Sequence, residues 1–243
     1  MYVLGIEAAT PVAGVAVVNE EKVLAERFIN NKRTHSVNLL PMIKEVIVDA
    51  GIKKEEINGI AVSAGPGSFT GLRIGMTTAK TLAQVWGIPI IAVSTLDAMS
   101  FPLIGYHGLV CPILNARKNE VYSAIYQGGA TEIKRLAPPM AVPMSELLQQ
   151  LSPWPDKKVL FLGDAIDIYR EQLKSHLGAK AQFAANAAVL PRGATVAELG
   201  LVKLNLGEVS SPLEIKPNYI RPSEAEVKWA EKHKGSGERG CGN

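Results

Sequence analysis

The chain has 243 residues and is 47% hydrophobic, so it can form one large domain or two smaller ones around a substantial core. Its net charge of +3 is mildly basic, and without a long Lys/Arg run it gives no argument for direct nucleic-acid binding. Only Cys111 and Cys241 are cysteines, which argues against a disulfide framework. No apolar run approaches ~20 residues and no signal-peptide pattern opens the chain, so we expect a soluble cytoplasmic protein that does not enter a membrane.

The first hundred residues predict a strand meander followed by helices and further strands. Strands expected at 2–8, 14–18 and 23–29 are joined by short turns, which excludes a dinucleotide-binding βαβ start. A helix over 34–50 ends at Gly51, and a strand at 59–62 leads into a glycine-rich loop and a helix to about Trp86. A strand at 89–93 and a short helix, capped by Ser94 or Thr95 and ending at Met99, complete this part.

The second half repeats the meander. Strands are expected at 109–114, 120–126 and 132–136, a helix at 144–151, a strand at 159–162 and a helix that opens at 163–164 and runs to about 177. Thr195 and Glu198 form a capping-box pattern at the start of a helix to about Leu206. A last strand is expected at 217–221 and a disordered tail at 235–243.

These elements predict an α/β protein with two lobes. We place the N-terminal lobe, with its partner-binding helices, at residues 1–100 and the C-terminal lobe at 101–222. A C-terminal helix and flexible tail are expected at 223–243.

The stretch from Ser63 to Gly75 contains four glycines and a proline between Gly65 and Gly75. Ser68 and Thr70 are good helix caps, so the amide N–H groups at the start of the following helix should point outward, as in many anion sites. The stretch is neither a Walker A loop nor a nucleophile elbow. A tight structural turn and a phosphate site are therefore equal alternatives here. The residues expected to contact an anion or nucleotide are Thr10, Gly67, Ser68 and Arg73.

Both helices of the first lobe carry apolar residues on two sides. Leu39, Leu40, Ile43, Val46, Ile47 and Ala50 make the main face of the first helix. The second faces predict either internal packing or contact with a partner's helices. Their residues are His35, Val37, Pro41, Val48, Ile74, Thr78, Thr81 and Val85. Gly71, Gly75 and Ala79 predict a groove that another backbone could approach.

Residues 64–75, Ala-Gly-Pro-Gly-Ser-Phe-Thr-Gly-Leu-Arg-Ile-Gly, resemble the signature of the TsaB (YeaZ) family. Supporting stretches lie at 34–36, 93–96, 115–117 and 219–221, and the resemblance spans about residues 1–230. It implies the actin/sugar-kinase/Hsp70-like superfold, with two lobes that each have a mixed sheet flanked by helices. It also implies a role in making N6-threonylcarbamoyladenosine at position 37 of ANN-decoding tRNAs. In that system TsaC makes threonylcarbamoyl-adenylate, TsaD transfers the group, TsaE is an ATPase, and TsaB pairs with TsaD.

The sequence departs from catalytic relatives at the positions that carry their chemistry. The His-x-x-x-His metal pair of TsaD corresponds here to Thr95 and Met99, neither a useful ligand for a divalent ion. Glu7 and Ala9 replace the Asp and Gly of the Asp-x-Gly-Thr phosphate hairpin, and no Asp-x-Gly-Gly follows Leu114. The sequence therefore predicts no catalytic residue, no metal and no cofactor.

We expect a non-catalytic scaffold that dimerises with a TsaD-like subunit, works with a TsaE-like ATPase and meets tRNA through the complex. Alone, the same surface could support a homodimer. Three alternatives stay open. One is an ATPase or phosphotransferase of the same superfold, and another is a glycoprotease-like peptidase with a Ser68–His35 couple. The third is a direct tRNA binder that uses Lys32, Arg33, Arg117 and Lys118.

Overall fold

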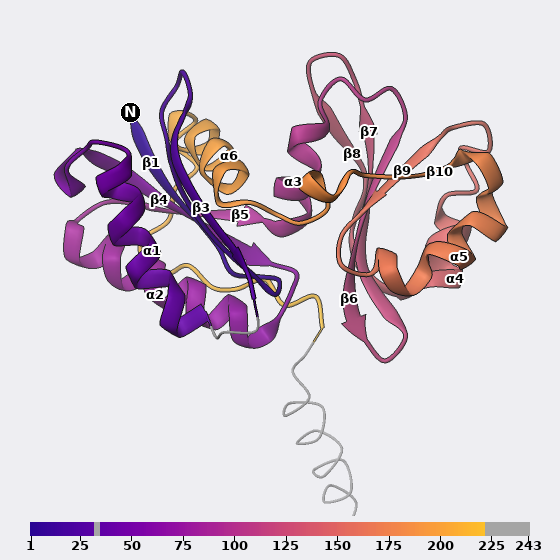
Figure 1. Ribbon diagram of the computed structural model, residues 1–243, viewed down its shortest axis with the longest axis horizontal. Coiled ribbons are helices and arrows are strands. Elements are labelled where there is room, and N and C mark those ends of the chain that lie inside the picture. The colour runs from indigo at the N-terminus through magenta and orange to yellow at the C-terminus, as the bar shows by residue number, and fades with distance from the viewer. Residues whose placement is uncertain (32–34, 222–243) are drawn as a thin grey trace, which may run out of the picture.

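The computed structural model describes residues 1–31 and 35–221 and has two lobes, each built on a five-stranded sheet (Figure 1). The two sheets have the same strand order when each is followed from its meander edge: β3-β2-β1-β4-β5 and β8-β7-β6-β9-β10. In each, the first three strands are antiparallel and the last two run parallel to the first. The chain thus contains one α/β unit twice, as the repeated meander predicts.

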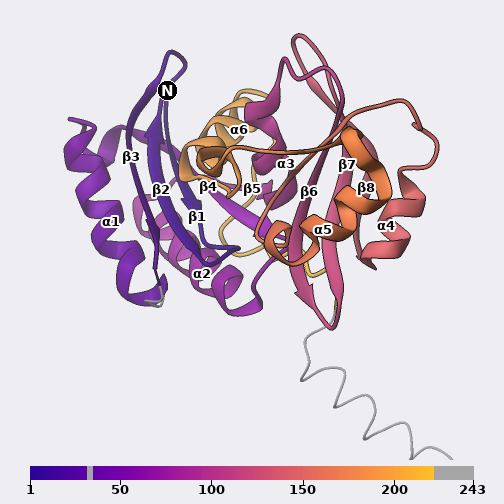
Figure 2. The same cartoon turned by 45° about the vertical axis from the view of Figure 1, so that its right-hand side comes forward.

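The first sheet lies between helices on both faces (Figures 1 and 2). Its strands are β1 (Tyr2–Glu7), β2 (Val12–Val18), β3 (Val23–Asn30), β4 (Ile57–Gly65) and β5 (Ile90–Ser94). Leu4 and Ile6 face a core shared with α1 (His35–Asp49) and α2 (Phe69–Trp86), while Val3 faces α6 (Gly193–Asn205). Both faces of the sheet are buried, so its central strands are almost continuously apolar.

The second sheet is covered in the same way. Its strands are β6 (Leu109–Arg117), β7 (Glu120–Gly128), β8 (Ile133–Pro143), β9 (Val159–Leu162) and β10 (Ala181–Phe183). Helices α4 (Met144–Gln150) and α5 (Ile166–Leu177) pack on one face, and α3 (Thr95–Ser100) packs on the other, between the lobes. Short 3-10 turns lie at Lys54–Glu56, Phe101–Leu103, Gly178–Lys180 and Asn186–Ala188.

Three expected local features are wrong. Residues 217–221 form no strand. They make a single backbone hydrogen bond to the sheet, from the Asn218 N–H to the Ala64 carbonyl, and one bond does not pair a strand. Thr195 is not an N-cap: α6 starts at Gly193, and the Thr195 hydroxyl donates back to the Arg192 carbonyl. The strand expected at 132–136 continues to Pro143 because it pairs with β7 along its length.

One expectation about the helix surfaces is also wrong, and another is confirmed. Leu40 was expected on the buried face of α1 but is 56% exposed. The groove at Gly71 and Gly75 does take another segment, as expected: Ala8, directly after β1, lies against both glycines, and a Cβ at Gly71 would lie 2.1 Å from the Ala8 carbonyl oxygen. The groove on α2 is therefore filled by the chain itself.

Within residues 1–31 and 35–221, no helix is long and apolar enough to cross a membrane. Cys111 is buried and unpaired. Cys241, Lys32, Arg33, the first residue expected in α1 (Thr34) and the expected C-terminal helix and tail (223–243) lie outside the described residues.

Candidate functional site

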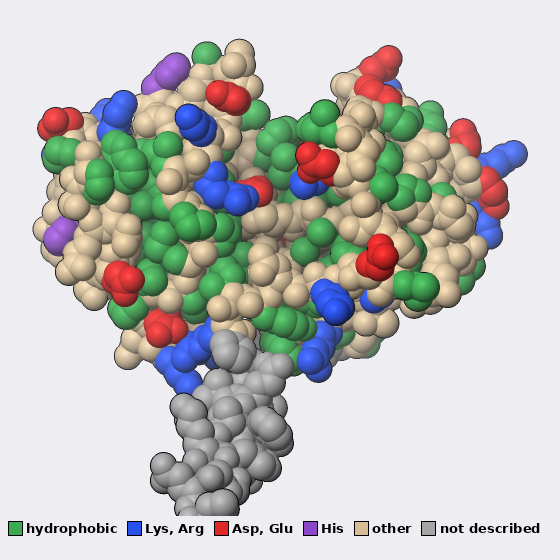
Figure 3. All heavy atoms as spheres, turned by 180° about the vertical axis from the view of Figure 1, so that it is seen from behind, with side chains coloured by type: hydrophobic (Ala, Val, Ile, Leu, Met, Phe, Trp, Pro, Cys, Tyr) green, Lys and Arg blue, Asp and Glu red, His purple; other side chains and the backbone are tan. Residues whose placement is uncertain are grey.

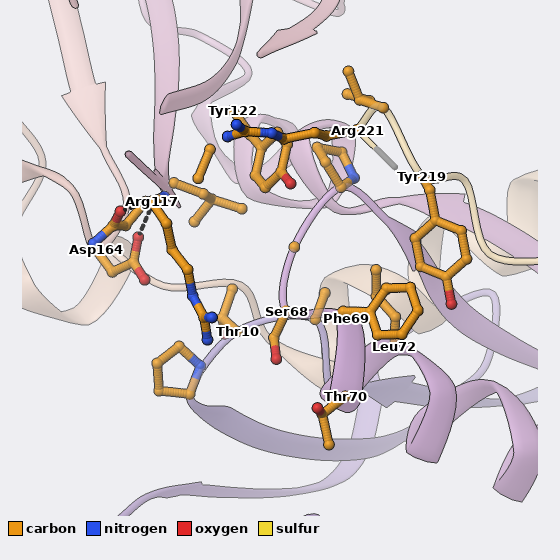
Figure 4. Close-up of a pocket in the computed structure, with 18 of the residues that line it drawn as sticks. Thr10, Ser68, Phe69, Thr70, Leu72, Arg117, Tyr122, Asp164, Tyr219 and Arg221 are labelled. Carbon is orange, nitrogen blue, oxygen red and sulfur yellow. Dashed lines mark hydrogen bonds between the residues drawn. The ribbon is translucent and has the colours of Figure 1, made fainter. Parts of the chain in front are cut away.

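A cavity of about 560 Å³ lies between the lobes (Figure 4). Most of its lining comes from the β1–β2 turn, the start of α2, the β6–β7 hairpin and the chain that returns from α6, and His35 of α1 and Asp164 after β9 complete it. The β1–β2 and β6–β7 turns occupy the same position in the two copies of the repeated unit. Because the two copies face each other, these turns lie on opposite walls of the cavity.

The glycine-rich loop lies against the β1–β2 turn on one wall of this cavity. The Ser68 backbone N–H donates to the Ala9 carbonyl at 2.6 Å, and a Cβ at Gly67 would lie 2.1 Å from that oxygen. The Ser68 hydroxyl accepts from the Gly71 N–H at 3.3 Å and caps α2. Glycine is thus required at position 67 by a close backbone approach, and one N–H of the loop is already used within the fold.

Glu7 ends β1 directly beneath this turn and is fully buried. Its Oε1 accepts from the Ala9 N–H at 2.7 Å, while Oε2 has no hydrogen-bond partner among the described residues. Burial raises the pKa of Glu7 from 4.5 to about 7, although bonds from Ser63 and the turn oppose the shift. The side chain therefore supports the turn and does not open into the cavity.

The opposite wall is the β6–β7 turn, whose backbone is unusual. Arg117, Lys118 and Asn119 all have left-handed conformations, with φ of 63°, 50° and 61°. The turn is fixed by the Asn115 side chain, which accepts from the Arg117 N–H at 2.9 Å, and by Asp164, which accepts from the Asn115 N–H at 2.8 Å. Figure 4 shows the Arg117 side chain directed toward Thr10 on the other lobe.

A cluster of aromatic and cationic side chains joins α2 to the returning chain at the cavity mouth. The Phe69 and Tyr219 rings are in contact, with centroids 4.7 Å apart and planes tilted by 31° (Figure 4). Arg73 lies 4.0 Å above the Phe69 ring and donates to the Tyr219 hydroxyl at 3.2 Å. Arg221 forms an ion pair with Glu120 at 2.6 Å, which links the returning chain to the second lobe.

Three of the four residues expected to contact an anion, Thr10, Gly67 and Ser68, line the cavity together. Arg73 does not line it but contacts Phe69 and Tyr219, which do. Their role as anion contacts stays a prediction. Sequence reasoning missed the left-handed turn, for which Asn119 was the available signal, and the contribution of Asp164 and Tyr122, which no local pattern indicated.

The residues expected at a partner interface differ in exposure. Val37, Val48 and Val85 are 60%, 70% and 75% exposed, and Pro41 and Thr81 are also exposed. Ile74 and Thr78 are partly buried. His35 is also partly buried, with its Nε2 2.9 Å from the Thr10 carbonyl oxygen, so its ring faces the β1–β2 turn.

The positions that correspond to the metal pair of TsaD are both in the core: Thr95 is fully buried and Met99 is 3% exposed. Among the described residues, no three His, Cys, Asp or Glu side chains are grouped as a metal site.

The sequence model of the family described as TsaD, tRNA N6-adenosine threonylcarbamoyltransferase, matches residues 22–229. The Bacillus subtilis protein named tRNA threonylcarbamoyladenosine biosynthesis protein TsaB is 34% identical over 96% of this chain and 100% of its own length. The chain belongs to the TsaB (YeaZ) family. The Escherichia coli TsaB protein is 39% identical over 52% of this chain and 55% of its own length.

A solved structure described as YeaZ from Pseudomonas aeruginosa has the same fold as this TsaB-family chain. It superposes with a TM-score of 0.76 at 25% sequence identity, over 90% of this chain and 99% of that one. A second structure from Pseudomonas aeruginosa, described as similar to the peptidase YeaZ, gives 0.77 at 24% identity over 90% and 99%. The duplicated sheets and these neighbours confirm the expected two-lobed fold, in which each lobe has a mixed sheet flanked by helices.

Proposed function

We propose that this chain is a non-catalytic subunit of tRNA threonylcarbamoyladenosine biosynthesis that pairs with a TsaD-like catalytic subunit through α1 and α2. The curated relatives that bear the TsaB name support the pathway. One observation supports the pairing: large apolar side chains on these two adjacent helices face outward.

The two helices form one continuous surface. His35 at the start of α1 contacts the Thr10 carbonyl, and Gly71 near the start of α2 contacts Ala8, so the helices start at the same edge of the sheet and run parallel. Val48 and Val85 lie near their C-terminal ends and are mostly exposed. Exposed Leu40 adds to this surface. Several exposed apolar side chains on adjacent helices are a feature of protein interfaces.

A TsaD-like subunit is suited to this surface. The TsaD family model matches residues 22–229, a range that includes both helices, so the catalytic subunit is expected to carry an equivalent helix pair. Two equivalent pairs can pack about a pseudo-twofold axis as a four-helix arrangement. Without that partner, a second copy of the chain can occupy the same surface. The metal-pair positions Thr95 and Met99 are in the core, which fits division of labour with a catalytic partner.

The test is association with the TsaD-like subunit. Val48→Glu places a charge in the proposed interface, and we expect it to abolish co-elution in size-exclusion chromatography. Val202→Glu is the matched control, because Val202 is 49% exposed on α6, on the opposite face of the sheet. If folded Val48→Glu and Thr81→Arg proteins associate as well as wild type, this interface is wrong. In the proposed complex, a TsaE-like ATPase and tRNA bind to the pair formed by this chain and the TsaD-like subunit.

A further inference from the structure

We propose that the chain returning from α6, residues 207–221, is a strap that latches the second lobe to α2 and holds the mouth of the interlobe cavity closed. The strap follows the end of α6, runs along α2 and ends at the cavity, where residues 218–221 form part of the lining. The first lobe holds most of it, and its last described residue, Arg221, reaches the second lobe. The latch lies within this chain, so it does not depend on the proposed partner.

The strap is bound to the first lobe along its length. Ser210 pairs with Ile90 at the outer edge of β5, with N···O distances of 2.9 and 3.3 Å. Ile215 is buried and packs in the core beneath α1 and α2. The Asn218 N–H then donates to the Ala64 carbonyl, near the end of β4, at 2.6 Å. Because these backbone bonds all go to one sheet, the strap moves with the first lobe.

Side chains of α2 hold the same segment from one side. The Lys80 ammonium donates to the Ile215 carbonyl at 3.2 Å. Two turns earlier, Arg73 donates to the Tyr219 hydroxyl at 3.2 Å and lies 4.0 Å from the centre of the Phe69 ring, which contacts the Tyr219 ring. Positions 73 and 80 are seven residues apart and so lie on the same side of the helix. The strap therefore follows this side of α2 back to the first residue of the helix.

Arg221 connects the strap to the second lobe. Its guanidinium forms an ion pair with Glu120 at 2.6 Å, and both side chains are partly buried. Glu120 is the first residue of β7, directly after the turn that forms the second lobe's wall of the cavity. Figure 4 shows Arg221 extending from the returning chain toward Tyr122, which is also on β7. An ion pair that is partly withdrawn from water is screened less than an exposed pair, so it can hold the two lobes together.

The lobes are joined on their other side by α3. Ala98 of this helix packs in the core beneath α6, whereas Leu96 and Met99 pack in the core of the second lobe. The chain crosses between the lobes directly after α3, at 101–108, and directly before α6, at 184–192. The covalent connections therefore adjoin α3 and α6, whereas the strap runs along α2 on the other face of the first sheet.

This arrangement lets the cavity open without disrupting either lobe. Its lining includes the start of α2 but no residue of α3 or α6, two helices that are described in full. Figure 3 shows from behind that the surface is hollowed between the lobes at the upper edge, so the lobes touch over only part of their facing sides. Lobes with limited mutual contact turn relative to each other unless a further contact holds them. A turn about α3 widens the mouth on the α2 side and draws Arg221 away from Glu120, so this ion pair is the latch.

The test is the distance between the lobes of the full chain, measured by single-molecule FRET at a dilution where a homodimer does not persist. Dyes are attached at Lys44→Cys on α1 and Gln172→Cys on α5, exposed positions outside the strap and the cavity lining. Cys241→Ser leaves Cys111 as the one natural cysteine, and Cys111 is buried. Arg221→Glu places two like charges at the latch. We expect it to give a longer mean distance and a broader distribution than wild type.

Two further variants separate the latch from a general effect of charge. Glu120→Arg/Arg221→Glu restores a pair of opposite charges, and we expect it to return the wild-type distribution. Lys203→Glu is the matched control, because it reverses one charge and breaks the 2.8 Å ion pair with Glu208 within the first lobe. We expect this control to give the wild-type distribution.

An unchanged distribution in Arg221→Glu would overturn the latch, as would a shift that the exchanged pair does not reverse or that Lys203→Glu reproduces. Hydrogen exchange at the Asn218 amide is a second readout. Its bond to the Ala64 carbonyl does not involve Arg221, so we expect equal protection in wild type and Arg221→Glu. Faster exchange in the variant would show that the strap has left the first lobe, which contradicts an anchored latch.

Discussion

The fully buried carboxylate of Glu7 accepts a hydrogen bond from the backbone N–H of Ala9, 2.7 Å away, and so fixes the turn on which the glycine-rich loop rests. The Ala9 carbonyl in turn accepts from the Ser68 N–H at 2.6 Å. A short chain of contacts thus connects the end of β1 to the start of α2. The position of α2, and of every side chain it presents, depends on this turn.

Glu7 should make the stability of the protein depend on pH. Its pKa is about 7 in the folded state against 4.5 for the free side chain. Between these values the unfolded chain ionises first and binds fewer protons, so the free energy of unfolding falls as pH rises from 4.5 to about 7 and then levels off. We expect the fall to reach about 3 kcal/mol.

Glu7→Gln tests this dependence, since Gln keeps an oxygen for the Ala9 N–H and cannot ionise. Urea unfolding at about pH 5 and pH 8 should show a smaller pH effect for the variant than for wild type. The pKa values of Asp164 and Glu198 are also raised by burial, and these groups remain in both proteins. An equal fall in wild type and variant would exclude Glu7 as the source.

Gly71→Ala should strongly destabilise the protein. The new Cβ would lie 2.1 Å from the Ala8 carbonyl oxygen, and a backbone atom cannot move aside as a flexible side chain can. We expect a loss of about 1–3 kcal/mol or more in the free energy of unfolding, as for other overpacked sites. Thr70→Ala, at an exposed neighbouring position, is the control. A wild-type melting temperature for Gly71→Ala would contradict the close approach of β1 to α2.

Ser68→Ala should cost about 1 kcal/mol, because the Ser68 hydroxyl caps the first turn of α2. Ser68→Gly should cost only a few tenths of a kcal/mol. Chemical denaturation can resolve the two. The sequence offers Thr70 as an equally good cap, but α2 begins at Phe69, so Thr70→Ala should have a smaller effect than Ser68→Ala.

Tyr126→Phe should loosen the contact between α3 and the second lobe. The Tyr126 hydroxyl donates to Asp97 at 2.7 Å, and Arg135 forms an ion pair with the same carboxylate. Loss of one hydrogen bond to a charged acceptor should lower the free energy of unfolding by about 1–2 kcal/mol. Tyr169→Phe on α5 is a suitable control, because its partly buried ring packs against the core of the second lobe. Equal stability of the two variants would mean that this bond contributes nothing.

Sequence patterns that lie within a single segment predicted many of the helices and strands. The strand expected at 159–162 is β9, the helix after the glycine-rich loop ends at Trp86 as predicted, and both meanders are present. These elements carry their own signals: apolar runs of strand length, a serine cap, and a glycine after the last turn. The family resemblance implied two lobes that each have a mixed sheet, and the duplicated strand order confirms that arrangement.

Contacts between distant segments were decided only by the tertiary structure. Whether Leu40 is buried depends on where the sheet lies relative to α1. The backbone that approaches Gly71 is that of Ala8, which follows β1 and lies some sixty residues earlier in the chain. The expected strand at 217–221 fails because the returning chain makes a single backbone hydrogen bond to the sheet, from the Asn218 N–H to the Ala64 carbonyl. The periodicity of apolar residues describes one helix or strand at a time, so it cannot tell which other segment packs against that helix or strand.

The candidate site shows the same division. The sequence by itself identified Gly67, Ser68, Arg73, Arg117 and Lys118 as notable residues, because glycine, cap and charge are local properties. Only the folding of two repeated units against each other brings the β1–β2 and β6–β7 turns to one cavity, and adds Tyr219 and Arg221 from the returning chain. Lobe packing is a balance of many weak long-range contacts, which no single motif encodes.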